Sequence, residues 1–146
     1  YDRGLVHILC RWSEIRKIVP EAELSIFYGW HVFDKKIVSY PEASRENLRE
    51  FKRKVTKLMQ QPGITHLDRI GHEEVAREFL SAGIWAYPCT FPENCSTLSL
   101  KAQAGGAIPI VIPTEGLDFT VRYGYKAPLS FIDKLDDALA LKITIY

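Results

Sequence analysis

The chain has 146 residues, of which 47% are hydrophobic and 25% are charged, and its formal net charge at pH 7 is +1. The length is that of one domain, and the composition is that of an ordinary globular protein. A charge so close to zero gives no reason to expect nucleic acid or an anionic membrane as the main partner. No apolar run approaches the length of a membrane-spanning helix, so we expect no integral membrane segment.

The three cysteines, Cys10, Cys89 and Cys95, are odd in number and form no Cys-x-x-Cys pair. This pattern favours free thiols in a reducing compartment, and we therefore expect a cytoplasmic location. The sequence starts at Tyr1, without a Met and without a signal-like segment, and we interpret it as an excised piece of a longer protein.

The N-terminal part of the sequence predicts a helix followed by a strand. Apolar residues recur at three- and four-residue spacings over residues 5–19, which places them on one helix face, and Pro20 ends the pattern. Residues 23–29 are rich in β-forming side chains, which predicts a strand.

The next segment contains most of the charge. Residues 30–40, which include Asp34, Lys35 and Lys36, are predicted to form a loop. Residues 44–60 are predicted to form a charged helix, because their apolar residues repeat at helical spacing. We interpret the many Arg and Lys residues of this helix as a solvated face rather than as a site for an anionic partner.

Histidines and carboxylates gather at only one place, which consists of His66, Asp68, His72 and Glu73. These residues straddle a short strand predicted over 64–67 and a helix predicted from 72 to about 82. Since they are divided between two elements and no cysteine supports them, we predict no metal site. The acidic residues suit the first turn of the helix instead.

A strand, a polar loop, a helix and a second strand are predicted between residues 84 and 112. Residues 84–87 form the first strand, and the loop over 91–96 ends in residues that favour helix N-caps. The helix stops at Gly105 and Gly106, and residues 107–112 are almost wholly apolar, as in a parallel strand covered on both faces. A loop that leaves a strand and opens a helix is where open α/β sheets bind ligands, and the helix N-terminus favours an anion. This stretch is the predicted functional site.

The remaining residues complete an α/β pattern. Residues 113–118 are predicted to form a loop, residues 120–124 a turn, and residues 129–141 a last helix. The alternation of strands and helices predicts a three-layer α/β domain with a parallel sheet and right-handed crossovers. No repeat or linker interrupts the sequence, so a single domain over residues 1–146 is expected.

Several short motifs occur together in a characteristic order. They are Arg3-Gly4-Leu5 at the first helix, the strand over 23–29, the Pro92-Glu93 loop, the Ala-Gln-Ala-Gly-Gly turn of residues 102–106 and the Pro109-Ile110-Val111 strand. From Asp2 to about Tyr125 the chain resembles the donor-binding domain of retaining glycosyltransferases of the GT-B fold, which include glycogen and sucrose synthases. The resemblance implies a three-layer Rossmann-like sheet that forms one half of a GT-B architecture. It also implies that the N-terminal acceptor-binding domain and the first strand of the donor domain are absent from residues 1–146.

The resemblance implies that a nucleoside-diphosphate sugar binds at the loop. Glu93 would contact the donor sugar as the candidate catalytic residue, while Arg3, beside Gly4, would reach the diphosphate with its guanidinium. The other donor-binding residues expected from the family are Asn94, Cys95, Ser96 and Thr97 at the helix start, and Arg69, Ile70 and Gly71 beside the nucleotide base. Because Arg3 and the helix dipole supply positive charge to the diphosphate, neither a metal nor another cofactor is expected.

Lys101 departs from the family pattern, which has a second Glu eight positions after the first to hold the ribose hydroxyls. An ammonium group donates hydrogen bonds but cannot accept them, so the hydroxyls lose a charged acceptor. Four interpretations stay open: an acceptor relocated elsewhere, Lys101 recruited to the phosphates or to an anionic sugar, a domain that no longer turns over donor, and a solvated helix residue with no role.

The function expected from the resemblance is metal-independent transfer of a sugar to an unknown acceptor, with retention. Two alternatives keep the fold: a degenerate donor domain that acts as a binding module, and a nucleotide-sugar epimerase. A third is an unrelated doubly wound domain of the flavodoxin or response-regulator type. Since the family places the acceptor side in the other domain, we expect residues 1–146 alone to show no sugar transfer.

Overall fold

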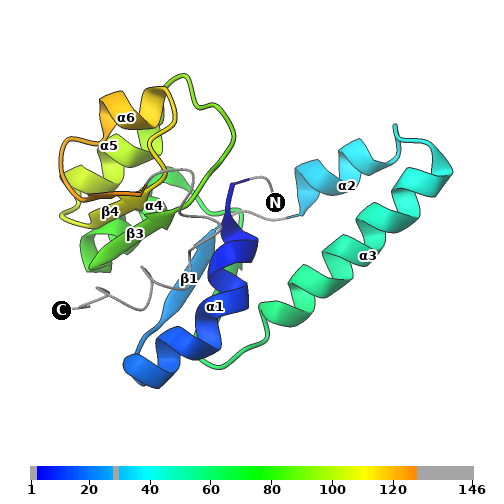
Figure 1. The fold of residues 1–146 in the computed structure, drawn as a ribbon, viewed down its shortest axis with the longest axis horizontal. Helices are drawn as coiled ribbons and strands as arrows, with labels where there is room; N and C mark the ends of the chain where they lie inside the picture. The colour runs from blue at the N-terminus through cyan, green and yellow to red at the C-terminus, as the bar shows by residue number, and fades with distance from the viewer. Residues whose placement is uncertain (1–2, 28–29, 128–146) are drawn as a thin grey trace. The chain divides into compact units, whose positions relative to one another are not determined.

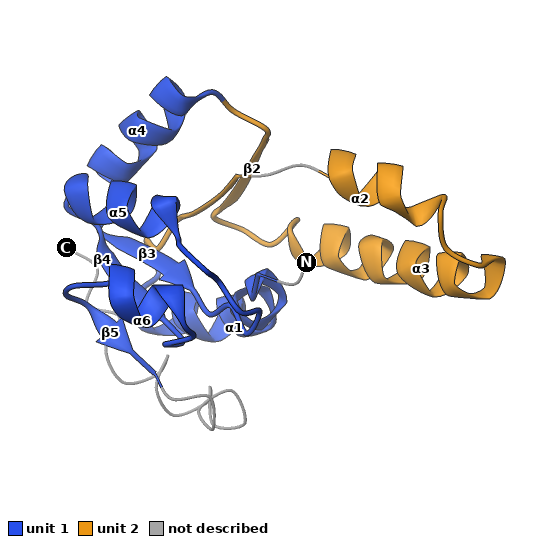
Figure 2. Cartoon of the chain, turned by 90° about the horizontal axis from the view of Figure 1, so that it is seen from above, with its two compact units in different colours: residues 1–20, 71–146 blue, residues 21–70 orange. Residues whose placement is uncertain are grey.

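The computed structural model describes residues 3–27 and 30–127. Helices alternate with parallel strands throughout, so the expected mixed α/β class is confirmed. The chain divides into two compact units, which Figure 2 shows in blue and orange. Unit 1 contains residues 1–20 and 71–146, and unit 2 contains residues 21–70. Each unit is described by itself.

Unit 2 contains two parallel strands joined through two helices. Its elements are β1 (Leu24–Phe27), α2 (His31–Ile37), α3 (Glu42–Leu58) and β2 (Ile64–Asp68). In the β1–β2 pair, Leu24 lies opposite Ile64, and the register shifts between Ile26 and Phe27. The predicted strands and the predicted charged helix are therefore present, with ends that differ by at most two residues. Residues 28 and 29, the predicted end of the first strand, lie outside the described residues.

The loop predicted over residues 30–40 is wrong, because most of it forms α2. Phe33 is buried in this helix and makes an edge-to-face contact with Trp30, with ring centroids 5.2 Å apart. Asp34 accepts two hydrogen bonds from the Lys52 ammonium of α3, at 2.7 and 2.8 Å. The Asp34 charge is thus satisfied across a pair of helices, a contact that a local sequence pattern does not reveal.

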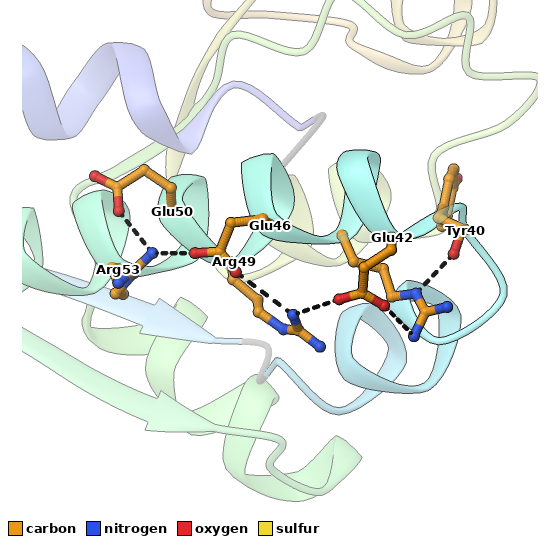
Figure 3. A network of polar contacts seen from close by, with 7 residues as sticks. Tyr40, Glu42, Glu46, Arg49, Glu50 and Arg53 are labelled. Atoms are coloured by element: carbon orange, nitrogen blue, oxygen red, sulfur yellow. Dashed lines mark hydrogen bonds and ion pairs between the residues drawn. The ribbon is translucent and has the colours of Figure 1, made fainter.

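The solvated face of α3 is a ladder of ion pairs (Figure 3). Glu42 and Glu46 each meet arginines one and two turns further along, and Glu50 meets one a single turn along: the pairs are Glu42 with Arg45 and Arg49, Glu46 with Arg49 and Arg53, and Glu50 with Arg53. Hydrogen bonds from Arg49 to Glu42 and then to Glu46 raise the pKa of the arginine. Exposed pairs of this kind contribute little stability singly, and they leave the face nearly neutral rather than basic.

Unit 1 contains a three-stranded parallel sheet and four helices among its described residues (Figure 1). They are α1 (Leu5–Ile18), α4 (His72–Ser81), β3 (Ile84–Tyr87), α5 (Thr97–Ala104), β4 (Ile108–Val111), α6 (Gly116–Thr120) and β5 (Tyr125–Lys126). The strand order is β3-β4-β5, with Ile84 opposite Ile108 and Ile110 opposite Tyr125. The predictions for α1, α4, β3, α5 and β4 are confirmed.

Two elements of unit 1 differ from the sequence prediction. The segment predicted as a loop and a turn, residues 113–124, contains the short helix α6, and β5 follows it. A helix of five residues is too short to show a repeat in its apolar residues, and β5 is held mainly by its pairing with β4. The helix predicted over residues 129–141 lies outside the described residues.

The sheet arrangement also differs from the predicted one. The described strands form two sheets, of two and three strands. The predicted three-layer domain would have one continuous sheet. The expectation that the strand over 107–112 is covered on both faces is wrong, because Ile108 is 49% exposed while Pro109 and Val111 are fully buried. Apolar content marks a strand, but long-range contacts decide which strands pair and which faces are covered.

The core beneath the central strands of unit 1 sets the stability of the predicted site. Cys89, Val111, Leu117 and Val121 form a buried cluster, against which Trp85 and Tyr87 pack. Leu117 belongs to α6 and is fully buried. This cluster joins the end of β3 to β4 and α6.

We predict that Leu117→Ala lowers the free energy of unfolding by about 2–5 kcal/mol, because it removes a buried side chain and leaves a cavity. The matched control is Leu80→Ala, because Leu80 is 73% exposed and its truncation changes stability by less than about 0.5 kcal/mol. Urea denaturation followed by circular dichroism measures both. Equal losses for the two variants would contradict the packing described here.

Candidate functional site

The predicted loop lies between the end of β3 and the start of α5. Ser96 caps α5, because its hydroxyl oxygen accepts a hydrogen bond from the Ser99 backbone N–H at 3.2 Å. The helix ends at Gly105, and Gly106 has a φ of 88°. Both predicted helix boundaries are therefore confirmed. The backbone amides of Ser96 and Thr97 precede the first hydrogen-bonded turn, where helix N–H groups have no partner within the helix.

The start of α1 is in direct contact with the end of β3. Gly4 is the N-cap of α1 and has a φ of 84°, a conformation that favours glycine. A Cβ at Gly4 would overlap the carbonyl group of Pro88, which follows β3. The close approach of these two backbones brings Arg3 to the loop that contains Glu93.

The Glu93 carboxylate contacts two other residues of the site. Its carboxylate oxygen Oε1 pairs with the guanidinium of Arg3 and also accepts a hydrogen bond from the Tyr87 hydroxyl at 3.0 Å. The Arg3 guanidinium lies over the Phe91 ring, with Cζ 4.8 Å from the ring centroid. The structure thus brings together two residues, Arg3 and Glu93, that the sequence analysis assigned to one site from separate motifs.

Gly116 holds the other side of the loop. Its backbone N–H donates to the carbonyl oxygen of Glu93 at 2.6 Å. A Cβ at Gly116 would overlap the carbonyl oxygens of Glu93 and Asn94, so the loop and the start of α6 fit together only with glycine at this position. Asn94 and Cys95 are exposed, and their side chains lie outside this backbone contact.

A buried polar network joins α5 to α6. The Ser99 hydroxyl lies 2.8 Å from both the Ser96 carbonyl oxygen and the Thr120 hydroxyl, and Thr120 donates to the Gly116 carbonyl oxygen at 2.7 Å. Gln103 continues the network, since its amide donates to the Thr120 carbonyl oxygen at 3.0 Å. Buried hydrogen bonds therefore connect the start of α5, at Ser96, to the start of α6, at Gly116.

The orientation of α5 follows from this network. Ser99 and Ala102 face the core and are fully buried, whereas Leu98 and Leu100 are 42% and 49% exposed. The two leucines of the helix face outward while a serine faces the core, which is the reverse of their places in an ordinary amphipathic helix. The hydroxyl of Ser99 is tolerated there because it is hydrogen-bonded.

Lys101 lies on α5 with an exposed side chain. Its ammonium lies 3.4 Å from Nδ1 of His72, in the first turn of α4. A lysine in the second half of a helix is also favoured by the helix dipole. The contact between Lys101 and His72 lies within unit 1.

The predicted base-binding residues lie where, along the sequence, unit 2 ends and unit 1 resumes. Arg69 and Ile70 follow β2 in unit 2, and Gly71 begins the second segment of unit 1. Gly71 is the N-cap of α4, and its backbone N–H donates to the Glu74 carboxylate at 2.6 Å. The acidic first turn predicted for this helix is therefore confirmed.

Three residues of the site were not identified from the sequence. Tyr87 and Phe91 contact Glu93 and Arg3, and Gly116 holds the loop. Tyr87 lies in an apolar strand, where an aromatic residue is expected to belong to the core. Its hydroxyl reaches Glu93 across the loop that follows the strand, and a local pattern does not reveal this contact. Gly116 lies in a predicted loop, where glycine is common, so the residue alone did not indicate a contact with Glu93.

The cysteines are free, as predicted: Cys10 and Cys95 are exposed and Cys89 is buried. Within residues 3–27 and 30–127, no three His, Cys, Asp or Glu side chains group closely enough to hold a metal ion. The same part of the chain contains no helix with the length and apolar character needed to cross a membrane. Comparisons of the chain with protein-family models, with curated proteins and with solved structures gave no match.

We predict that Gly4→Ala lowers the free energy of unfolding by about 3 kcal/mol or more, because it adds a backbone clash to an unfavourable φ. Gly106→Ala is the matched control, because Gly106 has a similar φ of 88° and its added Cβ would meet no atom within 4 Å. This control is expected to lose only about 1 kcal/mol. Thermal and urea denaturation give both values, and equal losses would argue against the tight contact with Pro88.

Proposed function

We propose that this chain is the donor-binding domain of a glycosyltransferase of the retaining GT-B type, which binds a nucleoside-diphosphate sugar for transfer to an unknown acceptor. The observation that supports the proposal most is the contact between Arg3 and Glu93 at the loop before α5. The family resemblance assigned these residues to the diphosphate and the sugar of one ligand. Their side chains meet, so the cation and the carboxylate lie within reach of one ligand.

The chemistry of the site suits such a donor. A leaving diphosphate needs cations and N–H donors where negative charge grows, and Arg3 and the N-terminus of α5 provide them. A sugar presents hydroxyl groups, for which the Glu93 carboxylate is an acceptor. In this proposal the guanidinium of Arg3, which is 44% exposed, exchanges Glu93 for the phosphates when the donor binds. No step of the proposal requires a metal.

Parallel strands support the Rossmann-like part of the proposal. Doubly wound dinucleotide-binding sheets are built from parallel strands joined through helices. Within unit 2, β1 pairs with β2 in parallel, and within unit 1 the strands β3, β4 and β5 are parallel neighbours. Each unit by itself therefore has the parallel pairing that the proposal expects.

A non-catalytic binding module is the second candidate function, and Lys101 favours it. The ammonium that stands in place of the family's second Glu is directed to His72 and offers no acceptor for ribose. Such a domain would keep the contacts of Arg3 and Glu93 but would hold its nucleotide weakly. Both candidates share a cytoplasmic location in the proposal.

We predict that the chain binds one of UDP, GDP, ADP or TDP selectively, and that Arg3→Ala weakens this binding about ten- to one-hundredfold, because a charge-assisted contact to phosphate is lost. Isothermal titration calorimetry measures both. Arg122→Ala is the matched control, since Arg122 also stacks on an aromatic ring, with Cζ 4.9 Å from the centroid of Phe119. Absence of binding by all four nucleotides would contradict the donor site in both of its forms.

We also predict that Lys101→Glu strengthens binding of the preferred ribonucleotide several-fold, because a carboxylate can accept from both ribose hydroxyls. The gain should be absent for the matching 2′-deoxynucleotide, which keeps the phosphates but lacks one hydroxyl. Calorimetry of the two nucleotides against both proteins separates the cases. Loss of binding in the variant would instead assign Lys101 to the phosphates.

A further inference from the structure

We propose that Tyr87 is a positioning residue for the donor sugar, because its hydroxyl holds the Glu93 carboxylate in the orientation that accepts a sugar hydroxyl. The inference rests on the function proposed above and identifies the group that keeps Glu93 in place. Its basis is the hydrogen bond from the Tyr87 hydroxyl to Oε1 of Glu93, at 3.0 Å.

The Glu93 carboxylate has two contacts within the site. Oε1 accepts from the Tyr87 hydroxyl, and the carboxylate pairs with the Arg3 guanidinium. A carboxylate has room for about four hydrogen bonds, so Glu93 keeps acceptor capacity for a ligand hydroxyl. The hydrogen bond from Tyr87 to Oε1 also restricts rotation of the carboxylate.

The Tyr87 ring is well suited to this role because it is itself held. It stacks on Trp85, with centroids 4.9 Å apart and an angle of 14° between the rings. Residues two apart on a strand share one face, and both rings pack against the cluster of Cys89, Val111, Leu117 and Val121. A hydroxyl on a packed ring has little freedom, so it gives a fixed point for the carboxylate.

Tyr87 and Arg3 differ in what they can do when a donor binds. The Arg3 side chain is 44% exposed and is the proposed partner of the diphosphate, so its contact with Glu93 is exchanged. Glu93 is only 16% exposed, and a carboxylate that loses its cation in such a position needs another donor. Tyr87 supplies that donor. Its hydrogen bond is the one that remains while the sugar is bound.

The test is Tyr87→Phe, which keeps the stacked ring and removes only the hydroxyl. Wild type and variant are titrated with UDP, GDP, ADP and TDP and with the glucose conjugate of each. We expect about tenfold weaker binding of the glucose conjugate and unchanged binding of the nucleotide alone, because the lost hydrogen bond acts on the sugar contact.

Two further variants sharpen this test. Tyr123→Phe is the matched control, because its hydroxyl donates to the Gln103 carbonyl oxygen at 2.7 Å, away from Glu93, and neither ligand should be affected. In a Glu93→Gln background, Tyr87→Phe should have much less effect than in wild type, because the two residues act as a pair. Glu93→Gln alone should weaken binding of the glucose conjugate relative to binding of the nucleotide.

The outcomes separate this inference from the proposed function. If a nucleotide binds and Tyr87→Phe affects it and its glucose conjugate equally, or affects neither, the positioning role is wrong while the donor site stands. If none of the four nucleotides binds wild type, both proposals fail. If Tyr87→Phe does not fold, Glu93→Gln decides, because equal effects on conjugate and nucleotide would overturn the role of the pair.

Discussion

The site depends on the close approach of two backbones, those of Gly4 and Pro88. Gly4 combines a positive φ with a position where a side chain would strike the Pro88 carbonyl, so the start of α1 can lie directly against the end of β3. That contact places Arg3 beside Glu93 and Phe91. Without it, the cation and the carboxylate would belong to separate surfaces, and the loop before α5 would be only a helix N-terminus.

The second constraint is the polar connection between α5 and α6. Ser99 occupies a fully buried position that an aliphatic residue would ordinarily fill, and its hydroxyl joins the two helices through Thr120. Gly116 completes the connection by donating to the Glu93 carbonyl oxygen. Buried polar groups stabilise one arrangement when all of them are satisfied, and no buried side-chain polar atom in the described residues lacks a partner. The loop that bears Glu93 is thus held by hydrogen bonds at both ends.

Much of the secondary structure could be predicted because it is marked locally. Residues close together in the sequence determine the apolar spacing of α1, the caps of α5 and the acidic first turn of α4. The segments that were mispredicted, α2 and α6, contact partners far away in the sequence: Asp34 pairs with Lys52, and Gly116 donates to Glu93. A strand's apolar character likewise did not reveal that Ile108 is exposed or that the strands divide into two sheets. Contacts between residues far apart in the sequence leave no periodic signal.

By itself, the sequence determined the alternation of helices and parallel strands, the N-cap of α5 and the residue types of the site, because each depends on the chemistry of a few adjacent residues. Only the tertiary structure decided that Arg3 meets Glu93, that Tyr87 shares the same carboxylate oxygen, and that α5 turns its leucines outward. These are matters of direction and distance between separate segments. They follow from packing around Gly4, Ser99 and Gly116, where the space available to one side chain is set by atoms of another element.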